Sequence, residues 1–189
     1  TPSMPVNLQD HMIGLHASTL IRDGGTLQIG IGSMGDALSA ALLARQGDNE
    51  GYRALLDDID TTPWHTLIER EGGVEPFAHG LYGCSEMFVH GLMVLADAGI
   101  VRRKVYPDVE RQAQANAGTL DESLHEDGVS IHGGFILGPR DFYQRLRELP
   151  HSKRCEFNMT AISYINELYG QEELKRLQRR DARFVNSAF

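Results

Sequence analysis

The stretch LQIGIGSMGDALSAALLARQG, residues 27–47, carries three glycines in a GxGxxG spacing between an apolar run and a segment of strong helix formers. We predict a short buried strand over residues 27–31, a turn, and a helix that Asp36 caps. By pattern alone, the glycines are also a dinucleotide-binding fingerprint. That fingerprint needs an acidic residue at the end of a second strand, about 20 residues further on. Acidic residues occur there, at positions 57–60, but the segment before them resembles a helix or loop.

The glycines have two other interpretations. They permit a tight strand-to-helix turn, which the context favours over NAD binding. Alternatively, the backbone amides of the turn approach a charged or thioester ligand, as the amides at helix N-termini do.

The order of strand, glycine turn and helix recurs along the chain. We predict a strand over residues 80–88 that enters a tight turn, followed by a helix over 89–101 that Gly99 ends. The segment 128–149 repeats the pattern, with a turn at residues 132–134 and a helix that begins near Pro139. Strands alternating with helices predict an α/β fold with an open, largely parallel sheet and helices packed on it, in one domain over residues 1–189.

Further elements are predicted outside these repeats. We expect helices over residues 8–21 and 171–181, and strands within 102–108, 155–166 and 182–189. Two polar stretches, residues 45–80 and 108–126, are interpreted as less regular insertions. The first has room for short helices near residues 51–60 and 65–73, and residues 110–128 are expected to loop over the surface.

Composition restricts the class of function. The chain has 26 acidic and 18 basic residues, and its net charge of −8 disfavours a nucleic-acid partner. No segment is apolar over the roughly 20 residues that a membrane-spanning helix needs, so no membrane partner is expected. The two cysteines, Cys84 and Cys155, form no disulfide framework and match no zinc motif. We therefore expect a cytoplasmic protein without a metal, in which Cys84 is a buried structural thiol.

Glu86 is the candidate catalytic carboxylate. It follows the predicted strand and glycine turn and stands next to the apolar residues 87–89. A carboxylate held among such side chains is poorly solvated, which raises its pKa and makes the ionised form more nucleophilic. The alternative is a helix-capping or surface-turn carboxylate, which the residue considered alone favours.

Five segments together resemble the C-terminal domain of the acetyl-CoA hydrolase/transferase family, which includes acetate and 4-hydroxybutyrate CoA-transferases. They are LQIGIGSMGDALSAAL (27–42), YGCSEMFVHGLMVLADAGI (82–100), IHGGFILGPRDFYQRL (131–146), MTAISYIN (159–166) and RRDARFVNSAF (179–189). The resemblance implies a CoA-transferase-like fold and a glutamate nucleophile, which here is Glu86 in the turn Ser85-Glu86-Met87. The substrates implied are an acyl-CoA and a small carboxylate, with no permanently bound cofactor.

The resemblance also implies the rest of the site. Asn166 matches a family asparagine expected near the oxyanion, although a strand-end turn residue is an equal alternative. The residues expected to line the acyl or CoA site are Gln28, Gly30, Ile31, Gly32, His132, Gly133 and Gly134. His132 is equally compatible with a hydrogen-bonded core histidine.

Family members also have an N-terminal domain and continue beyond the VNSA motif, so this chain is expected to be a fragment that works with those parts. A homo-oligomer is expected as well. Two alternatives remain: a non-catalytic binding or oligomerisation module, and, less favoured, an NAD-binding oxidoreductase domain.

Overall fold

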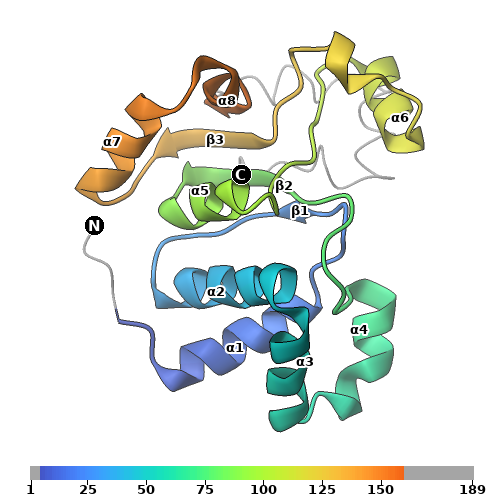
Figure 1. Ribbon diagram of the computed structural model, residues 1–189, viewed down its shortest axis with the longest axis vertical. Coiled ribbons are helices and arrows are strands. Elements are labelled where there is room, and N and C mark those ends of the chain that lie inside the picture. Colours follow the sequence, from blue (N-terminus) through green and yellow to red (C-terminus); the bar gives the residue numbers. More distant parts are fainter. Residues whose placement is uncertain (1–4, 160–189) are drawn as a thin grey trace.

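The computed structural model describes residues 5–159, which form a parallel sheet surrounded by helices (Figure 1). The four strands follow one another across the sheet in chain order, and every neighbouring pair is parallel. They are β1 (Thr26–Leu27), β2 (Tyr82–Phe88), β3 (Ile131–Ile136) and β4 (Phe157–Met159). The prediction of an α/β fold with a parallel sheet is confirmed.

The helices of the first half pack below β1 in Figure 1, where α2 lies between β1 and α1. They are α1 (Leu8–Thr19), α2 (Ser33–Gly47), α3 (Asn49–Asp58), the 3₁₀ turn η1 (Thr62–Trp64) and α4 (His65–Glu71). The polar stretch 45–80 is therefore more regular than its composition indicates. Asp48 starts α3 by accepting a hydrogen bond from the backbone N–H of Gly51.

The second half contributes α5 (His90–Asp97), α6 (Val109–Ala117), the 3₁₀ turn η2 (Glu122–Leu124), α7 (Arg140–Glu148) and α8 (His151–Cys155). The expectation of a surface loop over residues 110–128 is wrong, because α6 lies there. The carboxylate of Asp108 caps its first turn, and Gly118, in a left-handed conformation, ends it. The strand predicted within residues 102–108 is also wrong: its one pairing is an isolated antiparallel bridge from Val105 to Val129.

The strand and helix boundaries around the glycine motif differ from the prediction. The strand pairing of β1 ends at Leu27, so residues 28–31 form a loop rather than the rest of a strand. The helix α2 begins at Ser33, with Gly32 at the N-cap position. Asp36 therefore lies within the first turn of α2 and does not cap it, although its charge still suits the positive end of the helix dipole.

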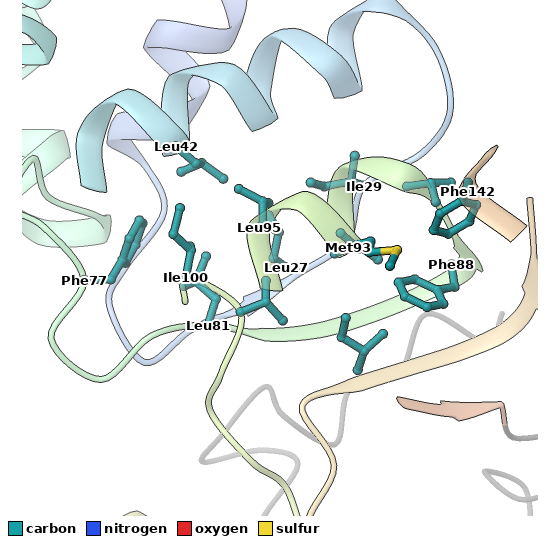
Figure 2. Packing of buried hydrophobic residues seen from close by; sticks show 14 residues of the cluster. Leu27, Ile29, Leu42, Phe77, Leu81, Phe88, Met93, Leu95, Ile100 and Phe142 are labelled. Carbon is teal, nitrogen blue, oxygen red and sulfur yellow. The ribbon is translucent and has the colours of Figure 1, made fainter. Parts of the chain in front are cut away.

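The main core lies between the sheet and the helices α2 and α5 (Figure 2). Leu42 of α2, Leu92 and Leu95 of α5 and Ile131 of β3 are all fully buried there. The opposite face of the sheet carries a smaller cluster, made of Tyr82, Cys84, Val105 and Val129. Cys84 is buried, as expected of a structural thiol. Within residues 5–159, no helix has both the length and the apolar character to cross a membrane.

Candidate functional site

Three predicted site segments occupy neighbouring positions in the sheet. The register pairs Leu27 with Gly83, so the loop at residues 28–32 leaves β1 beside the second half of β2. On the other side of β2, Cys84 and Ser85 pair with His132 and Gly133. The glycine loop, the Ser85-Glu86-Met87 segment and residues 132–134 are thus brought together by strand pairing.

Glu86 lies within β2 and not in a turn, and it is exposed. The expectation of a poorly solvated carboxylate is therefore wrong for the part of the chain that the structure describes. Side chains alternate along a strand. Gly83 lies against Leu92 of the helical layer, and Tyr82 and Cys84 lie in the cluster on the opposite face. Because Glu86 is two residues beyond Cys84, its side chain lies on the same face of the sheet as those of Tyr82 and Cys84.

The glycine loop, residues 28–32, is open to solvent along most of its length. Gln28, Gly30, Ile31 and Gly32 are all exposed, and a Cβ added at either glycine meets no atom within 4 Å. Gly32 has a φ of +112°, which side chains rarely adopt. A Cβ on Gly35 would lie 2.5 Å from the carbonyl oxygen of Gly30, so the loop folds tightly onto the first turn of α2. The motif is a strand-to-helix turn, as one interpretation predicted.

The dinucleotide interpretation fails on its second requirement. The acidic residues at positions 57 and 58 close α3, and Asp60 follows it with a φ of +49°. No second strand ends at these residues, because the chain enters β2 only at Tyr82. The βαβ unit that a dinucleotide site needs is therefore absent from this segment.

Ser85 connects β2 to the glycine loop. Its hydroxyl donates to the carbonyl oxygen of Ile29 at 3.1 Å, and both residues are buried. Ile29 lies beyond Leu27, the last paired residue of β1. The contact therefore joins the glycine loop to β2 where backbone pairing has ended. A serine buried inside a strand needs a hydrogen-bond partner, and this was the signal in the sequence for the contact.

His132 lies within β3, so the expectation that residues 132–134 form a strand-to-helix turn is wrong. Its Nδ1 is 2.6 Å from the hydroxyl of Tyr82, and the two rings meet edge to face. Burial lowers the pKa of His132 to about 4. The ring is consequently neutral near pH 7, which fits a hydrogen-bonded core histidine and makes it a poor cation for binding phosphate.

Arg103 also lies against Tyr82. Its guanidinium lies 5.5 Å from the centre of the Tyr82 ring and donates to the carbonyl oxygen of Gly25 and to Oγ1 of Thr26. Neither Tyr82 nor Arg103 belongs to the predicted site residues. The one signal available for Tyr82 was its position in phase with Cys84 and Glu86 along the predicted strand.

Gly133 is buried and Gly134 is exposed, both within β3. A Cβ on Gly134 would lie 3.2 Å from the backbone oxygen of Glu86, so the glycine lets the two strands lie close here. Asn166 lies outside the described residues. Within residues 5–159, no group of three or more His, Cys, Asp or Glu side chains is placed to hold a metal ion.

Comparison with known proteins adds no relative. No protein-family model matches the chain, and no curated protein matches its sequence. The resemblance to the CoA-transferase family therefore stays a prediction from the motifs.

Proposed function

We propose that the chain is the nucleophile-bearing domain of an acyl-CoA:carboxylate CoA-transferase or acetyl-CoA hydrolase, with Glu86 as the nucleophile. The observation that carries this proposal is the strand register, which sets Glu86 between the glycine loop and residues 132–134. Ligands of parallel α/β sheets commonly bind where loops leave the carboxyl ends of strands. The exposed loop at residues 28–32 leaves β1 in that way, next to an exposed carboxylate.

The proposed reaction begins with attack of a Glu86 carboxylate oxygen on the carbonyl carbon of the acyl-CoA. The carbon–sulfur bond breaks, CoA leaves as a thiolate, and an acyl-glutamyl anhydride remains. The thiolate then attacks the glutamyl carbonyl of the anhydride. This step releases the original acyl group as a free carboxylate and leaves a glutamyl-CoA thioester. An incoming carboxylate reverses the sequence and departs as the new acyl-CoA.

The glycine loop supplies the feature that this reaction needs at the oxyanion. Negative charge develops on the thioester oxygen during attack, and preorganised N–H donors stabilise it. The loop lies beside Glu86, and α2 begins at its end without a side-chain cap among the described residues. Its glycines have no Cβ, so backbone amides there are accessible to a ligand. We propose these amides as donors, with the side chain of Gln28 beside them.

Exposure of Glu86 decides between transfer and hydrolysis. Water that reaches the glutamyl-CoA thioester hydrolyses it, whereas transfer requires that water be excluded until the second carboxylate binds. We propose that transfer depends on a further part of the protein covering Glu86, and that this chain with Glu86 exposed favours hydrolysis.

The test is a covalent one. The full-length protein is incubated with acetyl-CoA, digested and examined by mass spectrometry, and we expect CoA attached to the peptide that contains Glu86. Borohydride reduces a glutamyl thioester to the alcohol, so pretreatment with acetyl-CoA and borohydride should inactivate the enzyme. Glu86→Gln should form no adduct, whereas Glu50→Gln, which changes an exposed carboxylate on α3, should behave as wild type. Full activity in Glu86→Ala would refute the mechanism.

A second candidate function is self-association, which exposed apolar side chains on α1 favour. Leu8 is 73% exposed, and Met12 and Ile13 are 40% and 46% exposed. A cavity of about 340 Å³ adjoins this helix, lined by Leu20 and by Trp64, the single tryptophan. Sedimentation over a range of concentrations tests this candidate. A dimer that Leu8→Glu or Met12→Glu dissociates, together with no CoA adduct, would favour an oligomerisation module.

A further inference from the structure

We propose that Ser85 is a positioning residue, whose hydroxyl holds the glycine loop in place beside Glu86. The proposal rests on the proposed function, because the purpose of the alignment is the reaction at Glu86. It assigns Ser85 no contact with the substrate.

Backbone pairing between β1 and β2 stops at Leu27. The register between β1 and β2 comprises Thr26 with Tyr82 and Leu27 with Gly83. Past Leu27, the loop has no strand ladder to β2 that would fix its position. Beyond this point, the hydroxyl of Ser85 links β2 to the loop, because it donates to the carbonyl oxygen of Ile29.

This contact is buried. Ser85 is 4% exposed and Ile29 is 3% exposed, so water cannot easily replace the serine as donor. A buried carbonyl that loses its donor costs about 1–3 kcal/mol. After removal of the hydroxyl, the carbonyl of Ile29 regains a partner most simply by moving toward solvent. That movement takes the loop away from Glu86.

The geometry of the strand constrains Glu86 as well. Successive side chains of a strand point to opposite faces. Ser85 points toward the helical layer, and its bond to the backbone carbonyl of Ile29 favours the pleat that directs Glu86 to the other face of the sheet. One hydrogen bond thereby constrains both the loop and the orientation of the neighbouring carboxylate.

The other side of the loop is fixed independently. The carbonyl of Gly30 lies so close to Gly35 that a Cβ there would be 2.5 Å away. The loop is therefore held between the first turn of α2 and Ser85. Loss of one of these two restraints should displace the loop without unfolding the helix or the sheet.

The expected kinetic effect is on the chemical step. Misplacing oxyanion donors lowers the rate of the step that needs them, whereas most of the CoA molecule binds away from the reacting carbonyl. For Ser85→Ala, we expect Glu86–CoA adduct formation at saturating acetyl-CoA to slow by about 10- to 100-fold. The KM should change by less than about threefold, because binding in the ground state is largely retained.

The experiment compares four forms of the full-length protein: wild type, Ser85→Ala, Ser85→Thr and Ser18→Ala. Threonine keeps a hydroxyl at the same position and should restore most of the rate. Ser18 is the matched control, because it is fully buried and its hydroxyl lies 2.7 Å from both the carbonyl oxygen of Leu15 and the hydroxyl of Tyr52. Its alanine variant loses stability in the same way but leaves the glycine loop untouched.

Hydrogen–deuterium exchange gives a readout that does not depend on activity. The peptide that spans residues 28–36 includes the N–H of Asp36, which donates to the carbonyl oxygen of Gly32, and this peptide should exchange at least about tenfold faster in Ser85→Ala than in wild type or Ser18→Ala. Unchanged exchange in this peptide would overturn the proposal. If Ser85→Thr fails to fold, Ser85→Cys, a weaker donor, should give exchange between wild type and alanine.

The outcomes separate the two proposals. No CoA adduct in wild type refutes the proposed function, and with it any catalytic role for Ser85. An adduct in wild type that forms equally fast in Ser85→Ala refutes the positioning role alone. An equal slowing in Ser85→Ala and Ser18→Ala would assign the effect to general stability and also overturn it.

Discussion

The hydroxyl of Tyr82 lies 2.6 Å from Nδ1 of His132, and this contact links the neighbouring strands β2 and β3 beneath the candidate site. The ring centres are 6.1 Å apart in an edge-to-face arrangement. Cys84, the next residue on the same face of β2, pairs with His132 in the register. Burial lowers the pKa of His132 to about 4, so charging this ring acts against the fold.

This burial predicts how stability depends on pH. The pKa of His132 is about 4 in the folded chain and 6.5 when unperturbed, so the unfolded chain binds the proton more readily. The stabilisation is complete above pH 6.5 and is lost as the pH falls through 4. Relative to His132→Asn, which has no titratable side chain at this position, the wild type should lose up to about 3 kcal/mol between pH 7 and pH 4. Urea unfolding at each pH measures this difference, and parallel curves for the two proteins would contradict it.

Arg45 is the largest buried charged group among the described residues. We therefore expect its replacement to lower the free energy of unfolding. Arg45 is 2% exposed, donates to the carbonyl oxygens of Ser18, Ile21 and Glu75, and lies 4.2 Å from the centre of the Phe77 ring. Arg45→Met removes the donors of three carbonyls at once. Because hydrogen bonds from a charged donor contribute about 1.5–3 kcal/mol each, we expect a loss of at least about 3 kcal/mol in the free energy of unfolding.

The matched control is Arg53→Met, one helix further along. Arg53 pairs with the carboxylate of Glu75, but its side chain is 43% exposed. Exposed ion pairs contribute about 0–1 kcal/mol, so this variant should unfold at nearly the wild-type urea concentration. Equal losses in the two variants would show that burial of Arg45 is not what makes it important.

The fold class was predictable because the strands and the main helices carry clear apolar patterns. β2 and β3 coincide with apolar runs, and α5 ends before Gly99, whose φ of +69° suits the predicted end of a helix. Helix α6 escaped prediction because its sequence, VERQAQANA, is mostly polar and resembles a surface loop in composition. It depends on the cap from Asp108 and on the turn at Gly118.

Strand pairing brings three of the predicted site segments together, but the local sequence did not indicate the geometry around Glu86. Gly83 favoured a turn before Glu86, whereas in the structure it lies within the strand. Its missing Cβ leaves room for Ile131 and Leu92, which would be 3.2 and 3.3 Å from such an atom. The Tyr82–His132 contact joins residues 50 positions apart and depends on the register of two strands, which the local pattern does not specify.

The carboxylate of Asp23 should make the stability of the segment at residues 78–80 sensitive to acid. This carboxylate accepts hydrogen bonds from the backbone N–H groups of Ala78, His79 and Gly80. Desolvation raises the pKa of Asp23, but the bonds from His79, Gly80 and Ala78 outweigh it and hold the pKa below its usual 3.8.

We expect Asp23→Asn to cost about 1–2 kcal/mol at pH 7, because an amide has one acceptor oxygen where the carboxylate has two. The contribution of the carboxylate is complete above pH 3.8 and is lost as the pH falls through the lowered pKa. The difference in unfolding free energy between wild type and variant should therefore narrow below pH 3.8. A difference that stays constant on acidification would refute this account.

The close contact between α2 and α5 predicts that the effects of Gly91→Ala and Ser39→Ala on the free energy of unfolding are coupled. A Cβ on Gly91 of α5 would lie 2.6 Å from the hydroxyl oxygen of Ser39 on α2, but 3.7 Å from its Cβ. That hydroxyl donates to the carbonyl oxygen of Gly35 at 2.8 Å, so it can rotate away only by losing a partly buried hydrogen bond. Gly91→Ala should therefore destabilise the chain by about 1–3 kcal/mol, the usual cost of overpacking.

In a Ser39→Ala background, the added methyl group meets only the Cβ of residue 39 and Cγ2 of Ile29, both at ordinary contact distances. Gly91→Ala should then be close to neutral or slightly stabilising, because alanine also favours the helical conformation over glycine. The double-mutant cycle, measured by urea unfolding, should give a coupling free energy of about 1 kcal/mol or more. Additive effects would mean that the helices separate to admit the methyl group, rather than that the serine hydroxyl blocks it.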